Sequence, residues 1–379
     1  MSRNWGGSDT IRGGIHFGVS SVSNSRKLLI VVGVRPQFVK VAPLLKALEE
    51  SPLEVALMHT GQHYDYRMSQ VFFRELNLPK PDIHAECGAG SHADQTARML
   101  VDIERALIEH SPDMTIVFGD TNSTLAGALA AAKLHIPVAH IEAGLRSYNR
   151  DMPEEINRLM VDHISSLLFC PSAADAGRLK SEGIEDGVFE VGDVMKDSIR
   201  RFLDLALERE EIVERHSLTR EGYGVATLHR PSNVDAPGVA MRILSELDQV
   251  GVPILAPIHP RLRKAIGDAR FENIILEEPF GYLDMIKLCH DASFVATDSG
   301  GLQKEAYWLK TPCVTLRSET EWTEILDTGW GRLASPMETD LREACANPVR
   351  PDEHPELYGD GFASDRIVST ISDWLKSEK

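Results

Sequence analysis

The chain has 379 residues, is 42% hydrophobic and 26% charged, and carries a formal net charge of −17 at pH 7. This length allows two domains with separate cores, and the composition is that of an ordinary globular protein. The acidic balance argues against nucleic-acid binding, which requires a basic surface, and apolar runs such as LLIVVGV are far shorter than the ~18–20 residues of a membrane helix.

Residues 1–26 differ in character from the rest of the chain. They are rich in Gly and Ser, and their one apolar patch, IHFGVSSV, is too short and interrupted for the core of a signal peptide. We expect a flexible leader that carries no chemistry.

Strand and helix patterns alternate from residue 27 onward. The apolar segments LLIVVG, EVALMHTG and MTIVFGD predict buried strands, and a helical segment follows each of them. Such alternation is typical of an α/β fold with a parallel, doubly wound sheet.

Positive charge stands at the start of the first predicted helix. Gly33 permits the turn after the first strand, and Arg35 and Lys40 follow it closely. A helix N-terminus already favours anions, so cations placed there indicate an anion site. The alternative is that both side chains are simply solvated.

Three acids mark the central stretch, residues 117–158. Asp120 follows one apolar strand, Glu142 ends the next, and Glu154 stands in the first turn of the helix that begins at Pro153. Parallel α/β sheets place their chemistry at the carboxyl ends of strands and at the N-termini of the following helices. The three carboxylates are therefore expected to converge on one crevice, which indicates proton transfer on a bound ligand.

Each acid also has a structural explanation. Asp120 can serve as an N-cap or first-turn residue, and acids that follow a proline at a helix start match the helix dipole. Glu142 is harder to explain in this way, because it ends an apolar strand where an unpaired carboxylate is costly.

A second alternating unit begins after a charged helical segment at about 194–215. Its strands are predicted at 225–230, 253–259, 273–278, 294–300 and 312–317. We therefore expect two Rossmann-like domains that face a cleft, an N-terminal one over 27–200 and a C-terminal one over 201–364. The final segment, 365–379, has apolar residues at helical spacing and is expected to cross back to the first domain.

Two motifs in the second half favour a nucleotide diphosphate. Ser299, Gly300 and Gly301 form a Gly-rich turn at a helix start, where backbone N–H groups can approach phosphate oxygens. Glu305 lies one turn later, where it can accept both hydroxyls of a ribose. His229 ends another strand and suits a phosphate or a leaving oxygen. Against this, glycines often serve only turns, and a single histidine is often structural.

The cysteines are far apart and mostly in apolar context, with no metal-ligand spacing among them. Buried reduced thiols in a cytoplasmic protein are therefore expected. The five positions are Cys87, Cys170, Cys289, Cys313 and Cys345.

Several long segments carry a resemblance to a known family. In order, they are GVRPQFVK, TGQHYD, FGDTNSTLAGALAAAKL, HIEAGLRS, PEEINR, VGDVMKDS, LHRPSNVD, TDSGGLQKEA and ETEW. Together, over about residues 27–379, they resemble the non-hydrolysing UDP-N-acetylglucosamine 2-epimerase family. The resemblance implies the glycosyltransferase type B fold and a homodimer as the usual state.

The resemblance further implies inversion at C2 of a UDP-2-acetamido sugar, with no metal or nicotinamide cofactor. UDP leaves as the C2 proton is removed, and it adds back as a proton arrives on the other face. By match to the family's motifs, the catalytic groups are Asp120, Glu142, Glu154 and His229, with base and acid unassigned among the three carboxylates. The UDP contacts implied by the same match are Arg35, Lys40, His229, Ser299, Gly300, Gly301 and Glu305.

Two positions depart from the family's usual pattern. Gln37 stands where the family's GTRPE has an acid, and Trp322 stands where the family has an arginine. Both changes resemble the subgroup that acts on UDP-2,3-diacetamido-2,3-dideoxyglucuronate for bacterial surface polysaccharide. Loss of a negative charge at Gln37 would reduce repulsion of a 6-carboxylate, and Trp322 would pack either on the C3 acetamido group or in the core. Residues 62–68 match only partly the motif through which some members bind an activating UDP-sugar.

Two other functions stay open on sequence alone. A hydrolysing relative would release UDP and a free mannosamine-type sugar, although the full RPQFVK and PEEINR segments favour the non-hydrolysing reaction. A type-B glycosyltransferase, or a catalytically silent UDP-sugar binder, would need the Gly-rich turn and Glu305 but not all three acids.

Overall fold

The computed structural model describes residues 25–62 and 66–378. Residues 1–24 of the expected leader therefore lie outside the described residues, as do residues 63–65 of the segment compared with the activator motif. Arg26 is already part of the fold, since its guanidinium donates to Asp113 Oδ1 at 2.6 Å and to the Leu375 carbonyl at 3.0 Å.

The N-terminal half is built on a seven-stranded parallel sheet in the order β3-β2-β1-β4-β5-β6-β7. Its central strands are apolar on both faces, as a sheet covered by helices on both sides requires. The strands are β1 (Lys27–Val32), β2 (Glu54–His59), β3 (Ile83–His84), β4 (Met114–Phe118), β5 (Val138–Ile141), β6 (Leu167–Cys170) and β7 (Val188–Glu190). The helices are α1 (Arg35–Leu48), α2 (Tyr66–Glu75), α3 (His92–His110), α4 (Asn122–Lys133), α5 (Pro153–Ile164), α6 (Ala173–Ser181) and α7 (Val194–Leu207).

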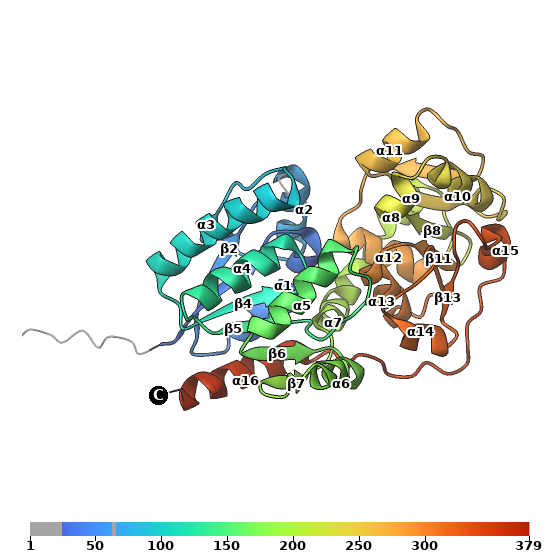
Figure 1. The fold of residues 1–379 in the computed structure, drawn as a ribbon. Coiled ribbons are helices and arrows are strands. Elements are labelled where there is room, and N and C mark those ends of the chain that lie inside the picture. The colour runs from blue at the N-terminus through green and yellow to red at the C-terminus, as the bar shows by residue number, and fades with distance from the viewer. Residues whose placement is uncertain (1–24, 63–65, 379) are drawn as a thin grey trace, which may run out of the picture.

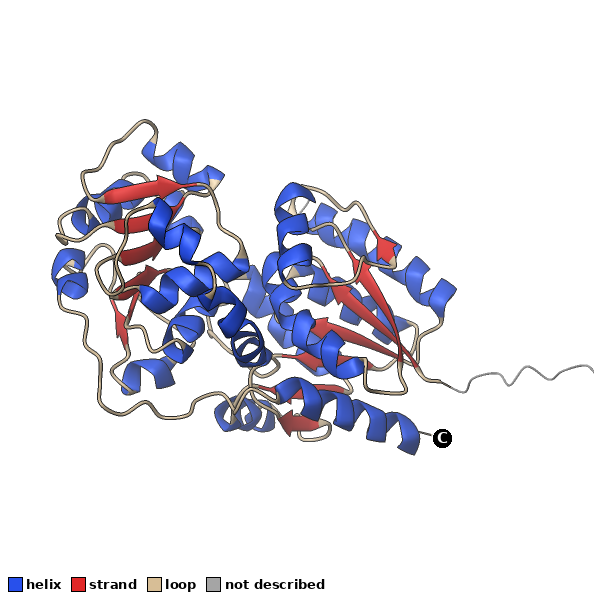
Figure 2. Ribbon diagram, turned by 180° about the vertical axis from the view of Figure 1, so that it is seen from behind, coloured by secondary structure: helices blue, strands red, loops and turns tan. Residues whose placement is uncertain are grey.

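The C-terminal half repeats this design with six parallel strands in the order β10-β9-β8-β11-β12-β13. The strands are β8 (Gly224–Thr227), β9 (Ile254–Pro257), β10 (Ile274–Glu277), β11 (Phe294–Thr297), β12 (Cys313–Thr315) and β13 (Gly331–Leu333). The helices are α8 (Glu210–Arg215), α9 (Pro231–Val234), α10 (Val239–Leu247), α11 (Pro260–Ile266), α12 (Tyr282–Asp291), α13 (Gly300–Trp308), α14 (Thr323–Asp327) and α15 (Leu341–Ala346). Figure 2 shows helices on both sides of each sheet, so the two doubly wound units predicted from the sequence are confirmed.

The two halves are joined through helices rather than through a continuous sheet. Helix α7 packs on α1 of the first half and on α12 and α13 of the second, and the Phe202 and Tyr282 rings meet edge to face. The last helix, α16 (Ala363–Ser377), returns from the second half and packs on α1 and α7 (Figure 1). One hydrophobic core therefore runs through α1, α7, α12 and α16.

Two further sequence expectations concern thiols and membrane helices. All five cysteines are buried and unbridged, as expected. Within the described ranges, no helix is long and apolar enough to cross a membrane.

Candidate active site

The candidate site lies where the strand order of each sheet reverses. In the first sheet the chain moves outward in opposite directions from the adjacent strands β1 and β4, and in the second sheet from β8 and β11. A crevice forms at the carboxyl ends of such strand pairs. Arg35 follows β1, Asp120 follows β4, His229 follows β8 and Ser299 follows β11. Each sheet therefore contributes two of the predicted residues from its switch point.

The side chain of Gln37 holds the β1–α1 turn in place through hydrogen bonds. This side chain is 1% exposed; its Oε1 accepts the Gly33 N–H at 2.7 Å, and its Nε2 donates to the Phe118 carbonyl at 2.9 Å. Gly33 is required here, because a Cβ would lie 2.1 Å from Ser123 Oγ. The amide of Gln37 thus ties the turn after β1 to the turn after β4. The side chain of Gln37 is thus bonded to protein groups, and the expectation that the missing negative charge at this position reduces repulsion of a 6-carboxylate stays a prediction.

Asp120 directly precedes the N-cap of α4 and is held by two side chains of α5. Arg158 Nη2 donates to its Oδ2 at 2.5 Å, and Asn157 Nδ2 donates to its backbone carbonyl at 2.8 Å. The Asp120 side chain keeps 28% exposure, whereas that of Arg158 has only 8%. A partly open carboxylate on a buried guanidinium is fixed in position yet still reachable by a ligand.

Glu142 is the most constrained of the three acids. Its φ of +72° lies in the left-handed region, which is rare for a non-glycine residue and marks a strained strand end. It is 9% exposed, and it forms ion pairs with Lys40 from α1 and, at 3.0 Å, with Lys304 from α13. Burial by itself would raise the Glu142 pKa, but the two ammonium groups hold that pKa well below its usual range. Glu142 is therefore ionised, and the structure brings it together with Lys40 as two of the predicted residues.

Glu154 and Glu155 are neighbours with different surroundings. Glu154 is exposed at the start of α5. Glu155 is 1% exposed and accepts the N–H groups of Ser147 and Tyr148, both at 2.9 Å, as well as Arg158 Nη1 at 3.0 Å. Burial raises the Glu155 pKa less than these hydrogen bonds lower it, so the pKa lies below its usual range. Glu155 fixes a loop, while Glu154 is free to face a ligand.

On the second sheet, His229 is organised by Asp298. The buried Asp298 carboxylate accepts the backbone N–H groups of His229 and Arg230 and lies 2.7 Å from His229 Nδ1. Burial would raise the Asp298 pKa, but His229 and these hydrogen bonds hold it below its usual range. An imidazole held at Nδ1 presents Nε2 on its opposite side. His229 is half exposed, so this nitrogen is placed for a ligand.

The Gly-rich turn forms the start of α13. Ser299 is the N-cap and its Oγ accepts the Leu302 N–H at 3.4 Å, and Gly300 and Gly301 occupy the first turn. Glu305 lies one turn further, where burial raises its pKa to about 7 and the nearby Tyr282 hydroxyl and Lys304 oppose that rise. An acid with this pKa changes charge near neutrality.

Cations of the two halves share the crevice. Burial lowers the His259 pKa, and the positive charges of Arg35, Arg261 and His229 lower it further. Arg35 of the first half and His229 of the second therefore both lie within electrostatic reach of His259. This is an arrangement that a polyphosphate would complement.

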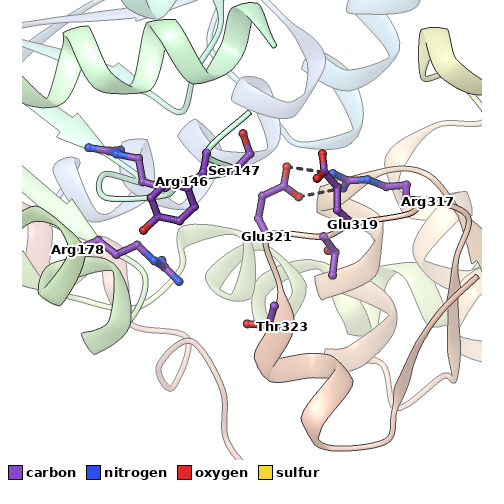
Figure 3. Close-up of a pocket in the computed structure, with 9 residues that line it drawn as sticks. Arg146, Ser147, Arg178, Arg317, Glu319, Glu321 and Thr323 are labelled. Atoms are coloured by element: carbon purple, nitrogen blue, oxygen red, sulfur yellow. Dashed lines mark hydrogen bonds and ion pairs between the residues drawn. The ribbon is translucent and has the colours of Figure 1, made fainter. Parts of the chain in front are cut away.

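A pocket of about 280 Å³ opens between the halves, and it is lined by residues other than the predicted site residues. Figure 3 shows Arg146, Ser147 and Arg178 of the first half facing the Arg317–Thr323 segment of the second, with Arg317 bonded to Glu321. Trp322, within that segment, is 5% exposed, and its Nε1 lies 3.3 Å from where a Cβ on Gly300 would stand. Trp322 therefore packs in the core directly under the Gly-rich turn.

Sequence reasoning missed four groups that shape the site. Arg158, Asp193, Asp298 and Lys304 all lie within the segments PEEINR, VGDVMKDS and TDSGGLQKEA. The acid that ends VGD was the one available signal, because it repeats the strand-end position of Asp120. Nothing local marks Lys304 as buried, since a lysine on a helix is usually solvated.

Known proteins are similar to this chain over nearly its whole length. A sequence model of the family described as UDP-N-acetylglucosamine 2-epimerase matches residues 46–372. A UDP-N-acetylglucosamine 2-epimerase homolog of Methanococcus maripaludis is 43% identical over 355 residues, which cover 91% of this chain and 99% of the relative. The UDP-2,3-diacetamido-2,3-dideoxy-D-glucuronate 2-epimerase of Pseudomonas aeruginosa is 41% identical over 356 residues, with the same coverage of both chains.

Solved structures agree with the fold. The UDP-GlcNAc 2-epimerase of Methanocaldococcus jannaschii, in complex with UDP-GlcNAc and UDP, is similar with a TM-score of 0.84 and 38% identity, covering 92% of this chain and 99% of that one. A Streptomyces glycosyltransferase complexed with thymidine diphosphate has a TM-score of 0.52 at 14% identity, covering 93% and 99%, and shares the fold alone. The glycosyltransferase type B architecture expected from the sequence is thus confirmed.

Proposed function

Because the chain belongs to the UDP-N-acetylglucosamine 2-epimerase family, we propose that it is an isomerase that inverts C2 of a UDP-2-acetamido sugar without hydrolysing it. The observation that supports this proposal is that the two sheets contribute different groups. Three acids, Asp120, Glu142 and Glu154, come from the first sheet, and the Gly-rich turn with Glu305 comes from the second. Asp120 and the Gly-rich turn follow the switch-point strands β4 and β11, and Glu142 and Glu154 follow the neighbouring strand β5.

The reaction proceeds by elimination and re-addition. A carboxylate takes the C2 proton, the C2–H electron pair forms the C1=C2 double bond, and the C1–O electron pair leaves with the β-phosphate of UDP. UDP then attacks C1 while a second acid delivers a proton to the opposite face of C2. Acids on both faces of the sugar are needed; Asp120 lies between β4 and α4, and Glu142 and Glu154 stand at the two ends of the β5–α5 connection.

UDP is held mainly by the second half. The Ser299 cap and the N–H groups of Gly300 and Gly301 receive phosphate oxygens, and Glu305 accepts the ribose hydroxyls. Arg35 closes on the phosphates from the first half, and His229 Nε2 donates to the departing oxygen. These groups stabilise charge that grows on UDP as the C1–O bond breaks.

The preferred sugar is UDP-2,3-diacetamido-2,3-dideoxyglucuronate, the substrate named for the Pseudomonas aeruginosa relative, with UDP-N-acetylglucosamine as the second candidate. Arg178 lines the pocket between the halves and supplies a guanidinium for a 6-carboxylate. The product would serve surface polysaccharide synthesis in the cytoplasm. Side-by-side measurement of kcat/KM for the two sugars tests this choice, and efficient turnover of UDP-N-acetylglucosamine alone would refute it.

The decisive experiment for the reaction is incubation with each UDP-sugar in D2O followed by NMR. The epimerised product should carry deuterium at C2 while UDP stays attached. Product that retains its original C2 hydrogen would exclude elimination. Stoichiometric free UDP with a free sugar would support the hydrolysing reaction, and exchange of no hydrogen would support a glycosyltransferase or a UDP-sugar binder.

A homodimer is the proposed assembly. Helices α3 and α5 both pack on α4 (Figure 1), and both carry exposed apolar side chains. These side chains are Val101, Ile108, Ile156 and Met160. Exposed apolar groups on neighbouring helices suit a protein interface. Light scattering during gel filtration tests the state, and a monomer at all concentrations would exclude it.

A further inference from the structure

Lys304 is a buried cation that reaches from the second half into the acids of the first. Its side chain is 1% exposed, and Nζ pairs with Glu142 Oε1 at 3.0 Å and with Asp193, the N-cap of α7. Nζ also lies 4.0 Å from the centroid of the Trp322 ring. An ammonium group so fully withdrawn from water is costly unless its partners compensate it.

Lys304 belongs to a balanced group of four buried charges. Lys40 and Lys304 are the cations, and Glu142 and Asp193 are the anions. None of the four side chains is more than 9% exposed. Because little water reaches them, a change of charge on one member is felt strongly by the others.

We propose that Lys304 is a positioning residue for the epimerisation. It holds Glu142 in the ionised form that takes the C2 proton. Once Glu142 is protonated, the positive charge of Lys304 is no longer neutralised by it and attracts the departing diphosphate. This role rests on the proposed function. It assigns Glu142 as the base for one direction, and it leaves Asp120 and Glu154 for proton delivery to the other face.

The change in net charge of these four groups during the reaction explains why a base would be placed between two lysines. Before reaction the four charges cancel. When the C2 proton moves to Glu142, the group gains one positive charge, and UDP gains one negative charge as the C1–O bond breaks. Lys304 lies on α13, the helix whose first turn, Gly300 and Gly301, is proposed to hold the phosphates, so the uncovered charge belongs to the same helix as the phosphate site. This attraction exists only once the transition state is approached, which is what lowers a barrier.

The groups that face Glu142 and Lys304 come from several elements. Lys40 and Lys304 lower the Glu142 pKa against the effect of burial. Asp193 and Glu142 raise the Lys304 pKa, which burial alone would lower. Two further acids lie within electrostatic reach of Lys304, and burial raises the pKa of Glu305 to about 7 and that of Asp175 to about 6. Since Glu305 also titrates near neutrality, a pH–rate profile has to be read beside a direct titration of Glu142.

The test uses three lysine variants. Lys304→Met removes the charge while keeping most of the volume, and Lys304→Arg keeps the charge. Lys287→Met is the matched control, because the Lys287 side chain is also buried, at 5% exposure, and pairs with Glu210 of α8 at 2.6 Å and Asp291 of α12 at 3.0 Å rather than with a proposed catalytic acid. Turnover is followed as deuterium incorporation at C2, and UDP affinity by calorimetry.

We expect kcat to fall by ~10-fold to ~100-fold in Lys304→Met, with UDP Kd changed by less than ~3-fold, because the lost interaction is made in the transition state. Lys304→Arg should recover part of kcat, and Lys287→Met should stay within ~2-fold of wild type. Carbon-13 NMR of glutamate carboxyls, with the Glu142 signal identified by its loss in Glu142→Gln, gives a second readout. In the wild type this signal should not titrate above pH ~4, and in Lys304→Met its midpoint should rise by at least ~1 unit.

Several outcomes would overturn the proposal. If Glu142 titrates at an ordinary carboxyl pKa in the wild type, the proposal is refuted. This test needs no lysine variant, so it applies even if Lys304→Met fails to fold. Normal C2 exchange with unaltered kcat and unaltered Glu142 titration in Lys304→Met refutes the positioning role alone. Absence of C2 exchange with every UDP-sugar in the wild type overturns the proposed function, and the positioning role with it.

Discussion

The adjacent Glu154 and Glu155 at the start of α5 should respond differently when each is changed to glutamine. Glu155→Gln should lower stability, and Glu154→Gln should lower turnover. Glu155 is 1% exposed and accepts the N–H groups of Ser147 and Tyr148, the Ser147 hydroxyl and Arg158 Nη1. A glutamine has only one accepting oxygen, so at least one buried donor would face the new NH2 group. Glu154 is exposed and can change to an amide without disturbing buried contacts.

The cost of Glu155→Gln follows from these contacts. A buried donor left unsatisfied costs ~1–3 kcal/mol. Loss of the carboxylate charge that pairs with the buried Arg158 guanidinium adds to this cost, although Arg158 keeps its ion pair with Asp120. We therefore expect ~2–4 kcal/mol of lost stability, a large share of the ~5–15 kcal/mol typical of a folded protein. Glu154→Gln should change stability by less than ~0.5 kcal/mol but lower turnover by ~10²-fold or more, the scale of lost acid–base catalysis.

Urea unfolding at pH 7 gives the stability change from the midpoint at constant slope, and C2 deuterium incorporation gives turnover. The two substitutions serve as controls for each other, since they make the same chemical change one residue apart. The reasoning is refuted if Glu155→Gln shifts stability by less than ~1 kcal/mol, or if Glu154→Gln leaves turnover near the wild-type value.

Three other predictions concern the ligand. Asp120→Asn and Glu142→Gln should each lower turnover by ~10²-fold or more while calorimetry finds a much smaller change in UDP affinity, and near-normal turnover of Glu142→Gln would make that acid structural. Uridine affinity should weaken as pH falls below about 7, because burial raises the pKa of Glu305 to about 7 and the protonated acid is a poorer acceptor for the ribose hydroxyls. Calorimetry measures this affinity, and Glu305→Gln should remove its dependence on pH. UDP should compact the molecule, since Arg35 and Ser299 come from different halves, and X-ray scattering that finds equal radii of gyration with and without saturating UDP would contradict this.

The sequence alone determined the architecture and the edges where chemistry occurs. Apolar strands alternating with helices predict parallel sheets, and the carboxyl ends of parallel strands meet at one edge. Asp120, His229 and Ser299 were therefore placed correctly at strand ends without knowledge of their neighbours. The turn chemistry is equally local, because an N-cap serine and two glycines need only the helix that they start.

What each of these side chains contacts was decided only by the tertiary structure. The sequence shows that Gln37 brings no charge to the turn after β1, but only the structure shows that its amide bonds to the Gly33 N–H and the Phe118 carbonyl. Glu154 and Glu155 have the same chemistry and adjacent positions, and only the loop that folds over α5 buries one of them. Lys304 and Glu142 are 162 residues apart and meet because two sheets close on each other. Burial and long-range ion pairs depend on how whole elements pack, and no local pattern encodes that distance.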